Sequence, residues 1–275
     1  MGIISAILSL PVSIILVRWL MKCKWPAFEK GDVKRLLIAG ILSAVVASVG
    51  TIVFMLLRAV IVIGPDTLGS LFSARDEKSA LEIINQFRTE REFSFWRVFL
   101  NTLLTIGFVE ELCRYLFLHL STKNRRYVQT WMDWVICGGI VGTGFTIAED
   151  LLYSSGGIVL TIFRALMPFH FAFGAIMGYF IGKAKVTGER KYYAAAILIP
   201  VLLHTLFDSS IMALRDKDIF IILVLLMFLV MMAVSILMIV KIRRWSKNGA
   251  LDIAAEYYGE QEYYDEQEAY DETEE

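Results

Sequence analysis

The chain has 275 residues, of which 57% are hydrophobic, and its formal net charge is −1. This composition is too apolar for an ordinary soluble domain of that length and predicts a protein embedded in a lipid bilayer. Nothing in the charge distribution indicates a nucleic-acid partner. The three cysteines, Cys23, Cys113 and Cys137, lack paired spacing, which argues against a disulfide framework and against a cysteine-based metal site.

Apolar runs long enough to cross a bilayer, which takes about 20 residues, recur along the chain. They cover roughly residues 3–20, 36–63, 96–120, 132–154, 158–183, 192–214 and 219–241. The predicted fold is therefore all-α, a polytopic membrane protein of about seven transmembrane helices with a multi-spanning domain over residues 1–248.

The connecting segments predict the orientation, because short loops rich in Lys and Arg face the cytoplasm. Basic clusters follow the first, third, fifth and seventh runs: Lys22, Lys24, Lys30, Lys34 and Arg35; Lys123, Arg125 and Arg126; Lys185, Arg190 and Lys191; Lys241, Arg243, Arg244 and Lys247. We therefore expect the N-terminus outside and the C-terminus in the cytoplasm.

Two segments outside the apolar runs have their own character. The second loop, about 64–95, carries apolar residues that predict an outer amphipathic helix over residues 79–87, although a solvated connector fits equally well. Residues 249–275 are rich in Asp, Glu and Tyr, and from Asp252 onward they contain no Lys or Arg. We expect them to form a disordered acidic cytoplasmic tail.

The third run contains Glu110, Glu111 and Arg114 within one helical turn. A charge near the bilayer centre costs roughly 2.5–3.5 kcal/mol on insertion scales, so such residues indicate function by default. The arginine can pair with one carboxylate and leave the other able to react. Pairing for packing alone is an equally good interpretation of Arg114 taken by itself.

The next three runs add further ionisable residues on the outer side of the bilayer midplane: Glu149 and Asp150, then His170, then His204 and Asp208. We expect Asp150 to be solvated at the interface, whereas the others can converge inside the bundle. A carboxylate there can act as a general base toward water. Two imidazoles with a carboxylate can instead bind zinc, which activates a bound water. Glycines in these runs are interpreted as packing residues.

Four motifs in this order resemble the PrsW family of intramembrane proteases, which is related to the CAAX-type membrane proteases. The resemblance covers about residues 108–208, and its motifs are Glu110-Glu111-x-x-Arg114, Phe145-x-x-x-Glu149, His170-x-x-x-Gly174-x-x-x-Gly178 and His204-x-x-x-Asp208. It implies a bacterial plasma-membrane protease that cuts a membrane-anchored regulator, typically an anti-sigma factor, on its extracytoplasmic side. The family is usually classed as metallo, but relatives have been argued to be glutamate proteases.

The resulting hypothesis is a membrane-embedded endopeptidase with a catalytic core over about residues 96–214. Glu110 or Glu111 activates water, His170 and His204 bind zinc or polarise the scissile carbonyl, and Asp208 orients His204. By the resemblance, Glu149 is the family's third acid. The alternative is a proton-coupled transporter or channel, since acids and histidines that line a bundle also form proton relays.

Overall fold

The computed structural model describes residues 2–23, 28–73, 94–123, 125, 127–128, 130–152, 167–216 and 218–247. Within these ranges the regular elements are helices, and strands are absent. The elements are α1 (Gly2–Cys23), α2 (Lys30–Phe72), α4 (Phe95–Thr102), the π-helical turn η1 (Leu103–Gly107), α5 (Phe108–Thr122), α6 (Trp131–Leu152), α8 (Phe169–Thr187), α9 (Lys191–Asp216), the 3-10 turn η2 (Asp218–Phe220) and α10 (Ile221–Lys247).

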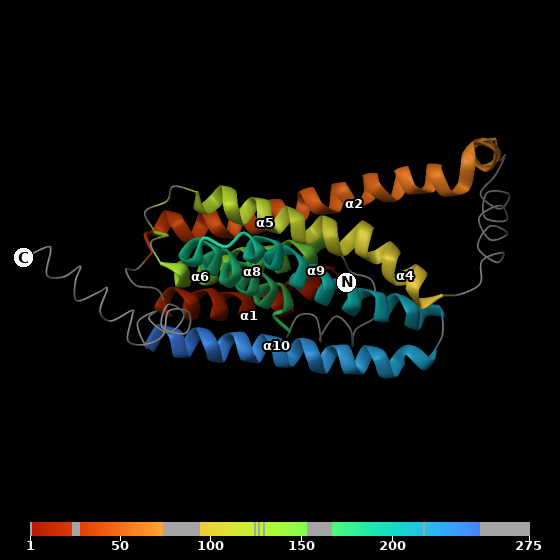
Figure 1. Cartoon of the computed structure of the whole chain (residues 1–275). Coiled ribbons are helices and arrows are strands. Elements are labelled where there is room, and N and C mark those ends of the chain that lie inside the picture. The colour runs from red at the N-terminus through yellow and green to blue at the C-terminus, as the bar shows by residue number, and fades with distance from the viewer. Residues whose placement is uncertain are drawn as a thin grey trace, which may run out of the picture.

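The helices pack lengthwise into one bundle, with α4, η1 and α5 forming a continuous rod (Figure 1). Every predicted apolar run overlaps one or more of these helices, so the all-α prediction is confirmed for the described part of the chain. The predicted start of the second loop, at about residue 64, is wrong, because α2 continues to Phe72. The end of an apolar run limits the part of a helix that suits lipid, and helical hydrogen bonding can continue beyond it. The predicted helix over 79–87, the tail and residues 158–166 of the fifth run lie outside the described residues.

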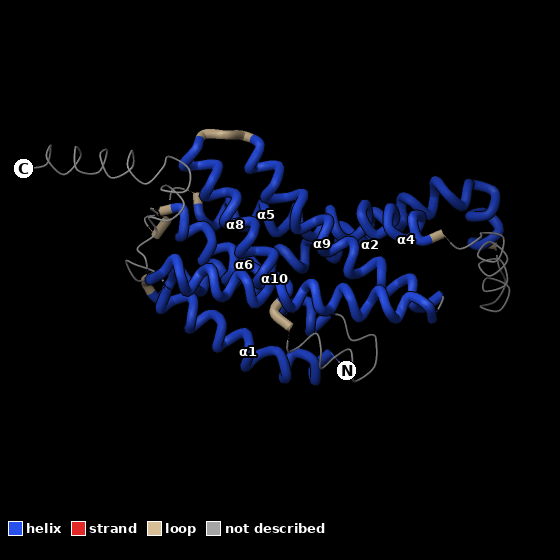
Figure 2. Tube along the Cα trace, turned by 60° about the horizontal axis from the view of Figure 1, so that its bottom comes forward, coloured by secondary structure: helices blue, strands red, loops and turns tan. Residues whose placement is uncertain are grey.

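Among the described residues, four helical segments are long and apolar enough to cross a membrane: Gly31–Leu57, Trp131–Leu152, Lys191–Leu214 and Ile221–Lys247. They differ in how much protein surrounds them. In the most apolar stretch of α6, 78% of the residues are buried inside the protein, against 28% in α10. Helix α6 is therefore the centre of the bundle, in contact with α1, α2 and α8 (Figure 2).

Glycines on both helices let α6 and α8 approach closely. A Cβ atom added at Gly174 would overlap the carbonyl oxygen of Gly138, and one added at Gly142 would overlap the carbonyl oxygen of His170. Small residues at helix interfaces permit such backbone contact in membranes. These contacts agree with the interpretation of the glycines as packing residues. They also bring the first turn of α8, which carries His170, into direct contact with α6.

The substitution Gly142→Ala is expected to destabilise the bundle by about 1–3 kcal/mol, because the added methyl group forces α6 and α8 apart. The measurement is the free energy of unfolding in detergent. Gly31→Ala is the matched control, since nothing lies within 4 Å of a Cβ atom added at Gly31. Equal stability of the two variants would show that the close approach at Gly142 is dispensable.

Candidate active site

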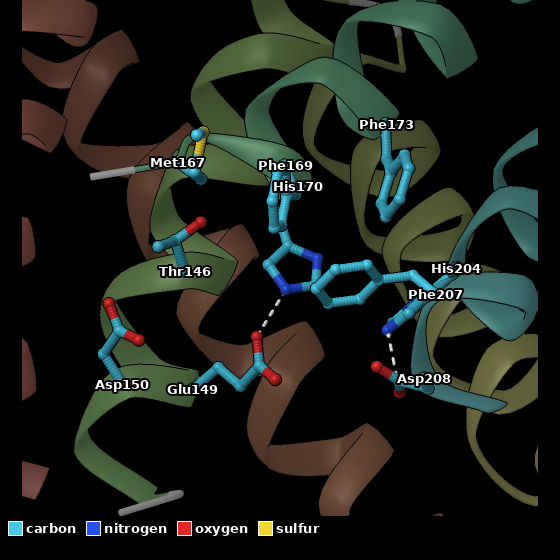
Figure 3. Close-up of a pocket in the computed structure, with 10 residues that line it drawn as sticks. All are labelled: Thr146, Glu149, Asp150, Met167, Phe169, His170, Phe173, His204, Phe207 and Asp208. Carbon is cyan, nitrogen blue, oxygen red and sulfur yellow. Dashed lines mark ion pairs between the residues drawn. The ribbon is translucent and has the colours of Figure 1, made fainter. Parts of the chain in front are cut away.

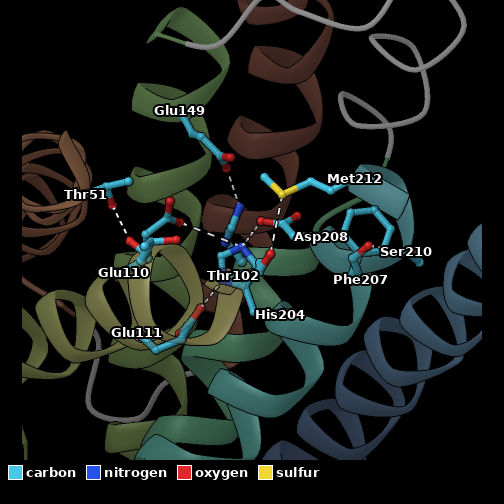
Figure 4. Close-up of polar contacts among 12 residues, drawn as sticks. Thr51, Thr102, Glu110, Glu111, Glu149, His204, Phe207, Asp208, Ser210 and Met212 are labelled. Carbon is cyan, nitrogen blue, oxygen red and sulfur yellow. Dashed lines mark hydrogen bonds and ion pairs between the residues drawn. The ribbon is translucent and has the colours of Figure 1, made fainter. Parts of the chain in front are cut away.

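The paired glutamates of α5 occupy different environments, although both are buried. Glu111 is fully engaged: Oε2 forms an ion pair with Arg114, and Oε1 accepts a hydrogen bond of 2.8 Å from Nδ1 of His204. Oε2 of Glu110 lies 3.8 Å from Nε2 of His204 and accepts no hydrogen bond from any residue that the structure describes (Figure 4). Glu111 is thus held on both sides, whereas Glu110 keeps one oxygen available.

The Arg114 side chain contacts three residues in this part of the site. Its guanidinium is fully buried, pairs with Glu111 and donates from Nη2 to Nδ1 of His170 at 2.9 Å. The same group lies over the ring of Phe145, with Cζ 4.0 Å from the ring centroid. A buried cation needs such compensation, because removing it from water costs several kcal/mol.

The sequence did not indicate a role for Phe145, although this residue begins one of the four motifs. It lies one turn before Glu149, so both residues share one face of α6. Its ring contacts Arg114 and packs 4.8 Å, centroid to centroid, from the imidazole of His170. The i, i+4 spacing to an acid inside an apolar run was the signal that could have pointed to it.

His170, in the first turn of α8, is held between two groups of opposite charge. Nδ1 faces the Arg114 guanidinium, and Nε2 pairs with a carboxylate oxygen of Glu149. An arginine can only donate hydrogen bonds, so Nδ1 acts as the acceptor and the ring proton of neutral His170 lies on Nε2. His170 therefore presents a hydrogen-bond donor toward Glu149.

His204 and Asp208 lie one turn apart on α9 and face the same region. Nε2 of His204 is 3.4 Å from Oδ2 of Asp208, on the side opposite its bond to Glu111. The rings of His170 and His204 are 5.3 Å apart, centroid to centroid. The structure thus brings together all seven predicted site residues, which come from four helices: Glu110, Glu111 and Arg114; Glu149; His170; His204 and Asp208.

Four of these residues, Glu149, His170, His204 and Asp208, line a small cavity (Figure 3). Its volume of about 30 Å³ has room for about two water molecules, since one water needs roughly 10–15 Å³. Asp150 lines it and is only 2% exposed, so the expectation of a solvated Asp150 was wrong: its side chain faces the inside of the bundle. The lining residues are Thr146, Glu149, Asp150, Met167, Phe169, His170, Phe173, His204, Phe207 and Asp208.

The profile described as "PrsW family intramembrane metalloprotease" matches residues 32–238, about three quarters of the chain. The chain belongs to the PrsW family. The match is longer than the four motifs alone, and it includes all seven site residues and most of α2, which lies outside the motif range of 108–208.

Curated relatives of this PrsW-family chain carry the name "Protease PrsW". The Bacillus subtilis protein is 30% identical over 137 residues, which are 48% of this chain and 63% of that protein. The Halalkalibacterium halodurans protein is 32% identical over 123 residues, covering 41% and 55%, and the Clostridioides difficile protein 33% over 117 residues, covering 38% and 49%. The chain thus spans about half to three fifths of the length of these relatives. No solved structure matches it.

The family description includes a metal, and one group of residues has suitable spacing. Glu111, His170 and His204 each offer a ligand atom, all within 4.8 Å of one another. However, the Arg114 guanidinium contacts two of these three residues. When one nitrogen of an imidazole binds zinc, the N–H of its other nitrogen donates a hydrogen bond to an acceptor. His204 meets this condition through Glu111, whereas Nδ1 of His170 faces a donor. In this arrangement the two-histidine site does not fit zinc.

Proposed function

We propose that this PrsW-family protein is an intramembrane endopeptidase that hydrolyses a single-pass membrane protein, such as an anti-sigma factor, on its extracytoplasmic side. The observation that carries the proposal is Oε2 of Glu110, a buried carboxylate oxygen that accepts no hydrogen bond from the described residues and lies beside His204. His204 in turn lines a cavity large enough for water. Membership of a protease family favours this function over the transporter or channel considered above.

In the proposed reaction Glu110 takes a proton from a water molecule, whose oxygen attacks the scissile carbonyl carbon. The negative charge that forms on the carbonyl oxygen needs a preorganised donor. Nε2–H of His170, which pairs with Glu149 in the substrate-free arrangement, is that donor. Glu110 then returns the proton to the departing amine, so the peptide bond breaks with one water consumed.

The remaining charged residues hold these groups in place. Glu111 and Arg114 fix the facing nitrogens of His204 and His170, respectively. Asp208 accepts a hydrogen bond from Nε2 of His204 when this nitrogen is protonated, and it thereby limits the rotation of the ring. Their contribution is the orientation of reacting groups, which is a large part of enzymatic rate enhancement.

The topology belongs to the same proposal: about seven spans in the bacterial plasma membrane, with the N-terminus outside, the C-terminus in the cytoplasm, a membrane domain over 1–248 and a catalytic core over about 96–214. Lys22, Lys123, Lys185 and Lys247 stand at or directly beyond the ends of α1, α5, α8 and α10, which gather at one end of the bundle (Figure 1). That end suits the cytoplasm, and the site lies toward the other end of α6.

Metal content tests the choice between glutamate and zinc chemistry. Because the Arg114 guanidinium faces His170, we expect the purified protein to contain no zinc that depends on both histidines. The measurement is elemental mass spectrometry of chelator-free wild type beside His170→Ala and His204→Ala. Near-stoichiometric zinc that disappears in both variants would show that Arg114 withdraws and that the histidines form a metal site.

A further inference from the structure

The rod that carries the two glutamates is not a regular α-helix. Between α4 and α5, residues Leu103–Gly107 form a π-helical turn, in which the backbone N–H of Phe108 donates to the carbonyl oxygen of Leu103. A π turn contains one residue more than the α turn that it replaces, and such turns occur often at functional sites. The turn ends three residues before Glu110, so it sets the direction in which both glutamates point.

Neighbouring helices hold this turn from two sides. The hydroxyl of Thr51 in α2 donates a hydrogen bond of 2.9 Å to the carbonyl oxygen of Thr105, and both residues are buried. On the α9 side, a Cβ atom added at Gly107 would overlap Oγ1 of Thr205, the residue after His204. The turn is therefore clamped between the helix that supplies His204 and a helix that supplies none of the proposed site residues (Figure 4).

The origin of this bond distinguishes it from the other hydroxyl contacts of the turn. The hydroxyl of Thr105 donates to the carbonyl oxygen of Asn101 at 2.8 Å, within its own rod. The hydroxyl of Thr102, the residue before the turn, lies 2.9 Å from the carbonyl oxygen of Val98 in the same rod and 3.4 Å from Sδ of Met212 in α9, and a thioether sulfur is a weak acceptor. Bonds within the rod move with the helix and cannot fix its rotation relative to the bundle, and the weak contact of Thr102 with Met212 lies before the π turn rather than in it. The bond from Thr51 joins two helices, so it can fix this rotation.

We propose that Thr51 is a positioning residue that maintains the π turn and thereby the orientation of Glu110 and Glu111, an inference that rests on the proposed protease function. If the turn relaxed to an α turn, α5 would rotate by about 100° and shift by about 1.5 Å relative to α4. Adjacent residues of a helix are about 100° apart. The rotation would therefore remove Glu111 from His204 and alter which carboxylate faces it.

The test compares Thr51→Val, which keeps the side-chain shape without the hydroxyl, with Thr51→Ser, which keeps the hydroxyl. Cleavage of a reconstituted single-pass substrate is followed at several substrate concentrations. We expect kcat of Thr51→Val to fall about 10- to 100-fold, since even a partial shift toward the α turn misplaces Glu110, and a misplacement near 1 Å can cost on the order of 100-fold. KM should stay unchanged and Thr51→Ser should restore kcat. Each rate is divided by the concentration of folded protein recovered from size-exclusion chromatography, because a loss of folded protein alone would also lower the apparent kcat at constant KM.

Thr122→Val is the matched control, because it removes a buried threonine hydroxyl from α5 that bonds within its own helix, to the carbonyl oxygen of Leu118. Its kcat should equal that of the wild type. If wild type cleaves and Thr51→Val has the same kcat, or Thr51→Ser is as slow as Thr51→Val, the positioning role is wrong. If wild type itself does not cleave, the protease proposal fails, so the two failures are distinguishable.

Discussion

Glu110→Gln is expected to lower the cleavage rate by about 100- to 10,000-fold, the range that general acid–base catalysis contributes. The amide has the shape of the carboxylate but cannot accept the proton of the attacking water. Because Oε2 of Glu110 accepts no hydrogen bond from the described residues, its replacement breaks no such bond of that oxygen. The measurement is the initial rate of substrate cleavage in liposomes, with the unfolding midpoint recorded for each variant.

Glu189→Gln is the control for this variant, since Glu189 pairs with Lys191 outside the site, in the connection between α8 and α9. It should cleave at the wild-type rate. Glu111→Gln should also be slow, but it should additionally be less stable, because it removes the charge that faces Arg114. A Glu110→Gln variant as active as the control would transfer the role of base to Glu111 or Glu149.

Arg114→Met should destabilise the protein by about 3–5 kcal/mol, the cost of leaving one member of a buried ion pair without its partner. The variant leaves the Glu111 carboxylate without its cationic partner and removes the hydrogen-bond donor to His170. The free energy of unfolding, measured by denaturant titration in detergent, reports this loss. The same substitution at Arg18, an exposed residue of α1, controls for the chemical change.

Arg114→Lys separates charge from shape. Lysine keeps the positive charge but lacks the planar group that reaches Glu111 and His170 together and stacks on Phe145. We therefore expect a stability between those of Arg114→Met and the wild type. If Arg114→Met is as stable as Arg18→Met, the ion pair is not needed to compensate the buried carboxylate.

The convergence of acids and histidines was predictable because a charge inside an apolar run needs a partner, and the partners available were on neighbouring runs. Local spacing likewise placed Arg114 within reach of Glu111, and His204 within reach of Asp208. These predictions depend on helical periodicity, which the sequence displays directly.

Which glutamate would be free could not be predicted, since it depends on the π turn and on contacts from α2 and α9. Residues 103–107 read as an ordinary stretch of apolar helix, and a hydrogen bond from Thr51 joins positions 54 residues apart. The burial of Asp150 was missed for a similar reason. Distance along a run gives depth in the membrane, whereas the direction of a side chain depends on the helices packed around it.

The central place of α6 has a consequence for biogenesis. Its glycine-rich surface lies against the backbone of α8, and small residues permit this close approach. Before α8 has been synthesised, the nascent chain contains α1 and α2, which pack on α6, but it lacks α8, which covers the glycine-rich surface of α6. Translation through α8 is therefore the earliest stage at which we expect α6 to be fully packed.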